Sequence, residues 1–312
     1  MTIKKAVITA AARGDRLYPV ADTVQKAMLP VVDIDGINKP VIQIIAEEAF
    51  ASGVEEICIV CAPGDDKRYV ESFNTLQSSI ISSFKNSAWS EKQIAAISNL
   101  LDRLTFAVQD EPKGYGHAVY SSKEFVKDDP FLLMLGDYLY VSGLKDKSCT
   151  RQLLELAENE NCSAAAVNPT IEHQISRYGT LTGKILPNKK GVYRIEKIIE
   201  KPSVSLAELE LLTPGLRTGY YLCFFGMHVF KHPFFDLLSE YATTSTNNIL
   251  LTPVLQMLAE NEKYLAVEIK GNRYDTSKEF GLTHAQLALA LAGVKRDDML
   301  ASLVQLLAEA KE

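Results

Sequence analysis

Residues 5–19, KAVITAAARGDRLYP, decide the fold class of this 312-residue chain. An apolar run at 5–10 predicts a buried strand, and the small residues after it predict a tight turn around Gly14. Residues 40–52 then have apolar side chains at helical spacing, and a second apolar run follows at 56–61. Strand, helix and strand in this order are typical of a mainly parallel sheet with right-handed crossovers.

Further apolar runs extend this pattern along the chain. They predict strands at 104–109, 131–135, 163–168 and 221–225, and helices at 116–125, 150–159 and 249–261. Residues 74–103 hold two weak helical patterns and the only tryptophan, Trp89, so we interpret them as a helical insertion between two strands. The predicted fold is α/β: a three-layer, Rossmann-like sandwich with a mixed, mostly parallel sheet and helices on both faces.

The chain ends in two helical segments that part near Gly293. In the last segment, apolar residues recur at three- and four-residue spacing, at Met299, Leu300, Leu303, Val304 and Leu307. We expect this stripe to pack on the body of the protein, and the alternative is a contact with another subunit in a homo-oligomer.

Composition narrows the class of partner. The net charge of -6 argues against nucleic acid as the main partner, because a phosphate backbone demands a basic face. Residues 1–5 are not followed by an apolar run long enough for an export signal, and no stretch approaches the roughly 20 apolar residues of a membrane span. Small phosphorylated ligands remain compatible, since they need only a few placed cations.

Five cysteines, an odd number scattered through a long chain, suit a reducing cytoplasm. Cys58 and Cys61 form a C-x-x-C, a spacing used in redox and metal sites. They lie inside an apolar run, where strand geometry sends positions i and i+3 to opposite faces. We therefore interpret them as buried structural thiols.

The first loop is a candidate phosphate site. It offers the backbone amides of Ala10, Ala11, Ala12, Arg13, Gly14 and Asp15, and amides in tight loops after a strand bind phosphate oxygens. Arg16 and Lys26 could supply cations to the same oxygens. Taken alone, one glycine among alanines is equally typical of a simple turn, and two basic residues ten apart commonly face solvent.

The same loop opens a longer series of motifs. Small-small-x-Gly-x-Arg-x-x-Pro is followed in order by Lys26-Ala-Met-Leu-Pro30, Lys39-Pro-Val-Ile-Gln43, Gln109 five residues before Gly114-Tyr-Gly-His-Ala118, Leu135-Gly-Asp137, Tyr178-Gly179, Glu200-Lys-Pro202 and Gly271-x-x-x-Asp275. Over about residues 5–290 this series resembles the sugar-1-phosphate nucleotidyltransferases, and among them the bacterial UTP–glucose-1-phosphate uridylyltransferases. The resemblance implies the fold of the nucleotide-diphospho-sugar transferases. We expect a nucleotidyltransferase domain at 1–292, with a nucleotide-binding half at about 1–139 and a sugar-binding lobe at about 140–292, and a C-terminal helix at 293–312.

The resemblance also implies roles for single residues. Gln109, Gly114, Tyr115 and Gly116 would bind the nucleobase, and Tyr178, Gly179 and Glu200 would bind the sugar. Arg16 and Lys26 would hold the departing pyrophosphate, and Lys201 the attacking sugar phosphate. Asp137 and Asp275 would bind Mg²⁺, the cofactor we expect, because magnesium prefers carboxylate and phosphate oxygens. Without the resemblance, Asp137 is a strand-end turn residue, Asp275 is a solvated loop residue, and Glu200 with Lys201 is a surface ion pair.

The implied activity is transfer of a nucleotidyl group from a nucleoside triphosphate, with UTP favoured, to a sugar-1-phosphate, with glucose-1-phosphate favoured. The alternatives are a thymidylyl- or guanylyltransferase, and a non-catalytic or regulatory nucleotide-sugar-binding protein of the same fold. Asp15 keeps the last alternative open, because it stands where the family has Thr or Ser and its charge would oppose a triphosphate. A dehydrogenase is disfavoured, since no G-x-G-x-x-G follows the first strand.

Overall fold

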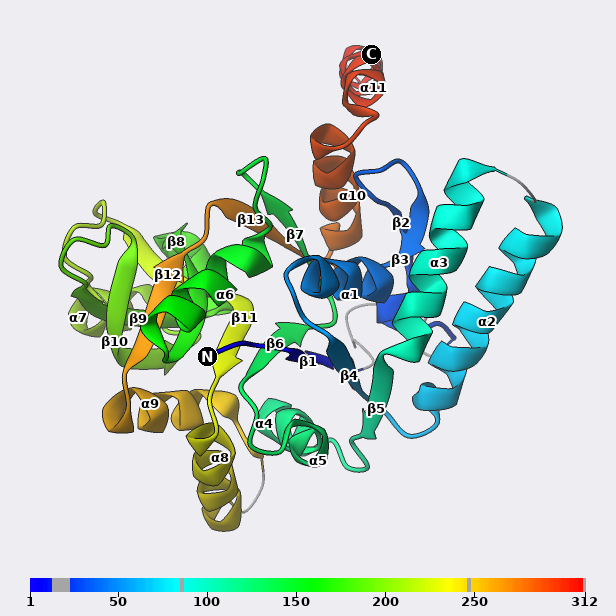
Figure 1. Cartoon of the computed structure of the whole chain (residues 1–312). Coiled ribbons are helices and arrows are strands. Elements are labelled where there is room, and N and C mark those ends of the chain that lie inside the picture. Colours follow the sequence, from blue (N-terminus) through cyan, green and yellow to red (C-terminus); the bar gives the residue numbers. More distant parts are fainter. Residues whose placement is uncertain (13–22, 85–86, 246–247, 311–312) are drawn as a thin grey trace.

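The computed structural model describes residues 1–12, 23–84, 87–245 and 248–310, and a nine-stranded sheet runs through its centre (Figure 1). In spatial order the strands are β5 (Leu104–Val108), β4 (Glu56–Cys61), β1 (Lys5–Thr9), β6 (Phe131–Leu135), β11 (Tyr220–Phe230), β8 (Ser163–Ile171), β12 (Tyr264–Glu268), β10 (Val192–Glu200) and β9 (Gly179–Ile185). The strands of this one sheet come from both expected regions, the nucleotide-binding half and the sugar-binding lobe.

Strand pairing differs between the two ends of this sheet. β5, β4, β1 and β6 pair in parallel. β11 is antiparallel to β6 and β8, β8 is parallel to β12, and β10 is antiparallel to both of its neighbours. The predicted mixed sheet is confirmed, and its continuous parallel part lies in the N-terminal half.

Helices cover both faces of the sheet, so the predicted three-layer α/β fold is confirmed (Figure 1). Alternate residues of β1 enter different cores: Ala6 and Ile8 join one cluster, and Val7 joins the other. The first face carries α1 (Val41–Ala51), α2 (Asp65–Ser83), α3 (Ala88–Asp102), α6 (Cys149–Glu160) and α10 (Gly281–Ala292). The other carries α4 (Tyr115–Tyr120), α5 (Lys123–Val126), α8 (Pro233–Thr244) and α9 (Leu251–Asn261).

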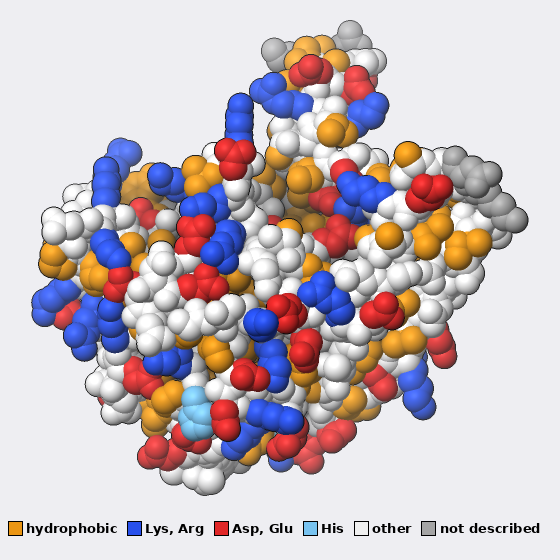
Figure 2. All heavy atoms as spheres, viewed as in Figure 1, with side chains coloured by type: hydrophobic (Ala, Val, Ile, Leu, Met, Phe, Trp, Pro, Cys, Tyr) orange, Lys and Arg blue, Asp and Glu red, His pale blue; other side chains and the backbone are white. Residues whose placement is uncertain are grey.

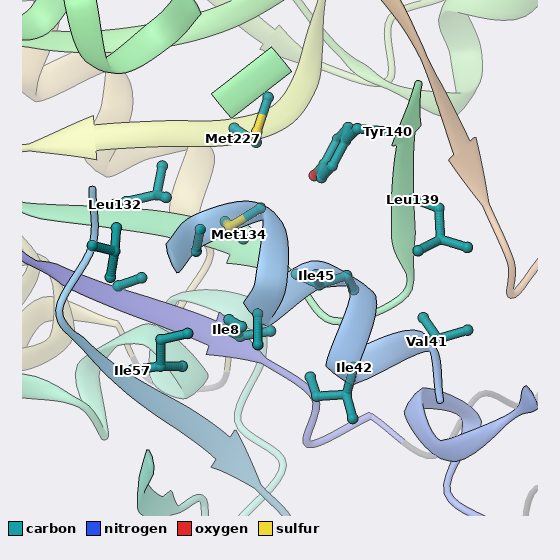
Figure 3. Close-up of a cluster of buried hydrophobic side chains, with 14 of the residues drawn as sticks. Ile8, Val41, Ile42, Ile45, Ile57, Leu132, Met134, Leu139, Tyr140 and Met227 are labelled. Carbon is teal, nitrogen blue, oxygen red and sulfur yellow. The ribbon is translucent and has the colours of Figure 1, made fainter. Parts of the chain in front are cut away.

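Helix α1 forms the centre of the first core (Figure 3). Its residues Ile42 and Ile45 are buried with Ile8 of β1, Ile57 of β4 and Met134 of β6. Full burial of each such side chain stabilises the fold by about 1.5–3 kcal/mol. The apolar residues at helical spacing in the sequence therefore identify the face of α1 that packs on the sheet. This packing holds β1, from which the first loop departs, in place.

Smaller elements complete the fold. β7 (Tyr138–Ser142) pairs with β13 (Gly271–Asp275), and β2 (Pro30–Val32) pairs with β3 (Asn38–Pro40). Helix α7 (Val204–Glu210) lies after β10, and α11 (Arg296–Glu309) ends the described chain. Among the described residues, no helix combines the length and apolar character needed to cross a membrane.

The predicted helix at 116–125 is wrong in one respect, because the structure divides it into α4 and α5. Two serines stand at the break. The hydroxyl of Ser121 donates to the carbonyl of His117, and that of Ser122 donates to the carbonyl of Val119. Such local bonds offer the backbone carbonyls an alternative to the helix ladder.

The expectation that the last helix packs on the body is also wrong. α11 has no buried residue and projects beyond α10 (Figure 1). Met299 and Leu303 are half-buried, whereas Leu300, Val304 and Leu307 are exposed. Hydrophobic side chains are accordingly visible on the surface of this projection (Figure 2).

The helical insertion and the buried thiols are confirmed. α2 and α3 lie between β4 and β5, and all five cysteines are buried and free.

Candidate active site

A cavity of about 370 Å³ lies at the carboxyl ends of β1, β5 and β6. Ligands of open α/β sheets bind at this edge. It is lined by Thr9, Ala11, Ala12, Lys26, Gln109, Pro112, Gly114, Tyr115, Ala118, Leu135 and Asp137. We call it the nucleotide cavity.

The first loop enters this cavity directly from β1. Ala11 and Ala12 line it, whereas Ala10 is buried and its N–H donates to the carbonyl of Val60 in β4 at 2.7 Å. The candidates Arg13, Gly14, Asp15 and Arg16 lie outside the described residues. Gly136 crosses the end of β1, where a Cβ would lie 2.7 Å from the carbonyl oxygen of Thr9, and this close crossing brings Asp137 beside the loop.

Lys26 and Asp137 form an ion pair at the wall of the nucleotide cavity. The Lys26 Nζ lies 2.5 Å from Asp137 Oδ2, and their side chains are 10% and 14% exposed. Lys26 comes from a short 3-10 turn, Lys26–Met28, and Asp137 follows β6, so residues 111 positions apart meet. The pair places a cation and a carboxylate where a phosphate group could contact both.

Asp137 directly precedes β7, and Asp275 is the last residue of β13, the strand that pairs with β7. Tyr138 pairs with Asp275 in the β7–β13 register, and the amide and hydroxyl of Thr276 both donate to the Asp137 carbonyl at 2.9 Å. The Asp275 carboxylate is held in place, because its Oδ1 accepts from the amide and hydroxyl of Ser277.

These two carboxylates fit Mg²⁺ in their donor chemistry. No group of three or more His, Cys, Asp or Glu side chains suited to a metal occurs within the described residues. Magnesium is commonly held by one or two carboxylates together with substrate phosphates. Asp137 lines the nucleotide cavity, and Asp275 lies next to it in the chain pairing of β13 with β7, so the two carboxylates are compatible with such a site.

Gln109 is held in position at the end of β5. Its Nε2 lies 3.2 Å from the Gly114 carbonyl oxygen and 3.2 Å from Nδ1 of His117. His117 lies in α4, and this contact connects its ring with the candidate base-reading amide.

Gly114 and Gly116 permit a close approach to the chain at Ile249. A Cβ at either glycine would lie 2.8 Å from the Ile249 carbonyl oxygen, and Gly114 has a φ of +97°. The Gly116 amide donates to the same oxygen at 2.8 Å. The contact of these glycines with the nucleobase stays a prediction. Within the chain, the absence of a side chain lets them pack against the Ile249 carbonyl.

A second cavity, of about 280 Å³, adjoins the first, since Tyr115 and Leu135 line both. We call it the sugar cavity. The four residues predicted for the sugar and its phosphate all line it, namely Tyr178, Gly179, Glu200 and Lys201. Its other lining residues are Tyr138, Arg177, Phe224, Gly226, His228, Leu251, Thr252 and Leu255.

Backbone geometry and hydrogen bonds place Glu200 and Lys201. Lys201 has a left-handed φ of +46°, a conformation that is uncommon outside glycine and often found at functional sites, and its amide donates to the Tyr178 carbonyl at 3.1 Å. Glu200 accepts a 2.8 Å bond from the Thr252 hydroxyl at Oε2, and its Oε1 lies 3.3 Å from Lys201 Nζ. A Cβ at Gly179 would lie 3.1 Å from Glu200 Oε2, so the glycine makes room for the carboxylate.

Two cations behind Tyr178 were not predicted from the sequence. The Arg273 guanidinium lies 4.1 Å from the Tyr178 ring centre, and Lys278 Nζ donates to the Tyr178 hydroxyl at 2.7 Å. Lys278 also lies 3.7 Å from Asp275 Oδ2, so it connects the sugar cavity with the second candidate metal carboxylate. The sequence offered one indication of their role, because both residues lie within three positions of Asp275.

Comparison with known proteins agrees with this geometry. The model of the family described as "Nucleotidyl transferase" matches residues 5–276. The chain belongs to this family. The UTP–glucose-1-phosphate uridylyltransferase of Streptococcus pneumoniae serotype 4 (strain ATCC BAA-334 / TIGR4) is 33% identical over 97% of this chain and 96% of its own length. That of Streptococcus pyogenes is 32% identical over 93% of this chain and 89% of its own length.

Two solved structures have a similar fold. A UDP-glucose pyrophosphorylase complexed with UDP-glucose aligns with a TM-score of 0.74 and 28% identity, covering 92% of this chain and 98% of that one. A UDP-glucose pyrophosphorylase from Acinetobacter baumannii aligns with a TM-score of 0.79 and 24% identity over 98% of this chain and 100% of that one, which supports the fold.

Proposed function

We propose that this nucleotidyltransferase transfers the uridylyl group of UTP to glucose-1-phosphate and releases UDP-glucose and pyrophosphate. The names of the relatives support this choice of substrates. The observation that carries the proposal is the pair of adjoining cavities, because Tyr115 and Leu135 line both. A sugar phosphate in one cavity would then lie beside a nucleotide in the other.

In the proposed reaction, a phosphate oxygen of glucose-1-phosphate attacks the α-phosphate of UTP, and pyrophosphate leaves in line. Catalysis of this kind depends on positioning and on positive charge near the developing negative charge. Lys26 would hold the departing pyrophosphate together with Arg16, and Lys201 would hold the attacking phosphate. No covalent intermediate with the protein is needed.

Asp137 and Asp275 would hold Mg²⁺, which would supply positive charge at the phosphates when bound. The chain's own part is to place the two carboxylates. Thr276 bonds the Asp137 backbone, and Ser277 bonds the Asp275 side chain.

Gln109 supports a pyrimidine nucleotide, because its amide can both donate and accept and is held at the wall of the nucleotide cavity. The competing thymidylyltransferase would use dTTP, which also carries a pyrimidine but lacks the 2′-hydroxyl of UTP, and the competing guanylyltransferase would use GTP, which carries a purine. A cytoplasmic location also belongs to this proposal, supported by the five free cysteines. The homo-oligomer stays a prediction, and removing α11, whose apolar side chains are exposed, tests it. Nucleic acid and membrane are not proposed as partners.

The test is a pyrophosphate-release assay with UTP, dTTP, GTP, CTP and ATP, each offered with a panel of sugar-1-phosphates and Mg²⁺. We expect the highest kcat/KM for UTP with glucose-1-phosphate. If pyrophosphate release were fastest with another nucleotide, that nucleotide would replace UTP as the assigned substrate. Complete inactivity, reversed by Asp15→Thr, would support the non-catalytic alternative instead.

A further inference from the structure

His228 lies deep in the sugar cavity. It lines the cavity with Phe224 and Gly226 of the same strand, β11, yet its side chain is only 5% exposed. Arg177 and Lys201 line the same cavity and are exposed. The cavity therefore has a charged mouth and a buried end, and His228 belongs to the buried end.

The surroundings of His228 cover most of its ring. The rings of Phe224 and Phe230 lie 4.9 Å and 5.4 Å from it, and that of Phe230 is nearly parallel to it, at 11°. Its Nδ1 lies 2.8 Å from the Tyr264 hydroxyl. The edge that remains carries Nε2, for which no hydrogen-bond partner is found in the described part of the chain.

Small residues on the intervening strand make the contact with Tyr264 feasible. His228 on β11 pairs with Ala165 on β8, and Ala165 pairs with Ala266 on β12. Tyr264 precedes Ala266 by two residues, so all four side chains share one face of the sheet. Two alanines leave room for the tyrosine to reach the imidazole across β8.

A purely structural role leaves one nitrogen of this ring unexplained. An aromatic hydrocarbon would pack equally well between Phe224 and Phe230, whereas Nε2 is a polar atom that keeps access to the sugar cavity, since it is not among the fully buried atoms that lack a partner in the described chain. Burial lowers the pKa of His228 to about 3, so the ring is neutral near neutral pH. A neutral imidazole has one donor and one acceptor, and a sugar hydroxyl can pair with whichever of them Tyr264 leaves.

We propose that Nε2 of His228 binds a hydroxyl group of the sugar ring and thereby helps to determine which sugar phosphate the cavity accepts. This inference rests on the proposed function, because it takes the sugar cavity to hold the glucose unit. The charges support one orientation of the substrate: its phosphate lies at the mouth, near Lys201 and Arg177, and its ring points inward. A neutral ring at the buried end would not compete for the phosphate.

The test compares the affinities for UDP-glucose and for UDP by titration calorimetry. The variants are His228→Asn, His228→Gln and Tyr264→Phe. An asparagine amide lies near the place of Nδ1 and can keep the bond to Tyr264, while a glutamine amide reaches near the place of Nε2. We expect His228→Asn to bind UDP-glucose about tenfold more weakly and UDP equally well, as for one lost hydrogen bond. His228→Gln and Tyr264→Phe should stay within about threefold of the parent.

The inference is overturned if His228→Asn and His228→Gln bind UDP-glucose alike, or if Tyr264→Phe loses as much affinity as His228→Asn. A parent protein that binds UDP-glucose no more tightly than UDP would also overturn it. The pyrophosphate-release assay reports on the proposed function separately, since it can succeed while His228 has no effect on sugar binding.

A second measurement needs only the parent protein. UDP-glucose analogues that lack one ring hydroxyl each should include one whose affinity falls about tenfold, and the imidazole ¹⁵N signals of His228 should shift with UDP-glucose and not with UDP. A His228 signal that is the same with both ligands would count against the proposal even if every variant failed to fold. If His228→Asn does fold, the loss for that one analogue should disappear, because the variant no longer contacts the missing hydroxyl.

Discussion

Single residues carry most of the chemistry at this site, and Asp137 is the clearest case. Its carboxylate pairs with Lys26 at 2.5 Å, and its backbone bonds to Thr276. A negatively charged carboxylate in this position can attract both the lysine ammonium and a metal cation. A neutral amide of the same shape lacks the charge that attracts them.

Asp137→Asn should lower kcat for pyrophosphate release by at least about 100-fold, the scale on which a group that stabilises transition-state charge acts. The amide has nearly the same volume, so the thermal unfolding midpoint should change little. Asp146→Asn is a suitable control, because Asp146 lines a different cavity. Near-parental turnover of Asp137→Asn in Mg²⁺ would remove Asp137 from the catalytic set.

Gln109 gives a prediction about base selection. Gln109→Ala should reduce the preference of kcat/KM for UTP over other nucleotides by about 1–3 kcal/mol, because the base would lose a polar partner. Gln77→Ala is the matched control, since that glutamine bonds to Ser98 in the helical insertion. Unchanged selectivity in Gln109→Ala would place the base-reading group elsewhere.

His228 also makes stability depend on pH. Its pKa is lowered from 6.5 to about 3 in the folded state, so between these values the unfolded chain binds a proton that the folded chain does not. The stability contributed by the neutral ring is therefore complete above pH 6.5 and is lost as the pH falls toward 3.

His228→Phe removes this group while keeping an aromatic ring in the stack. Below pH 6.5 the unfolding free energy of the variant, relative to the parent, should rise by up to about 1.4 kcal/mol for each pH unit. Urea unfolding at pH 7.5, 6, 5 and 4 measures the difference, and parallel pH curves would show that the pKa of His228 is ordinary.

At the scale of elements, the contact between the start of α4 and the chain before α9 depends on two glycines. Gly114→Ala places a Cβ 2.8 Å from the Ile249 carbonyl oxygen and strains a φ of +97°. Gly215 has a similar φ of +90° with no atom within 4 Å of the added Cβ, which makes it a matched control.

Both alanine variants bear the backbone strain, and only Gly114→Ala adds the steric conflict. We expect Gly215→Ala to lose about 1–2 kcal/mol of unfolding free energy and Gly114→Ala clearly more, with weaker UTP binding because Gly114 lines the nucleotide cavity. Equal losses in the two variants would show that the Ile249 contact relaxes without cost.

At the scale of the whole molecule, the C-terminal helix is separable from the folded body. No residue of α11 is buried, so a chain that ends at Val294 should unfold within about 2 °C of the parent and keep its pyrophosphate release. Scanning calorimetry and the release assay check this. A large fall in the unfolding temperature would mean that α11 is covered by a second subunit in solution, and light scattering on both chains would then show different masses.

The sequence by itself determined the local pattern of this protein. Apolar runs and helical spacing identify β1, α1, β4 and β6 nearly to the residue, because burial on one or both faces imposes a period on the chain. The order of the motifs was sufficient to indicate the family, and the family model that matches residues 5–276 then showed it.

The tertiary structure alone decided which distant residues meet. The ion pair of Lys26 with Asp137, the two cations around Tyr178 and the place of His228 at the buried end of the sugar cavity join residues far apart in the chain. The exposed position of α11 belongs here too, because an apolar stripe shows that a helix can bury one face but does not show that a partner is within reach. Periodicity is a property of neighbouring residues, whereas these contacts depend on strand order and crossovers, which no local pattern records.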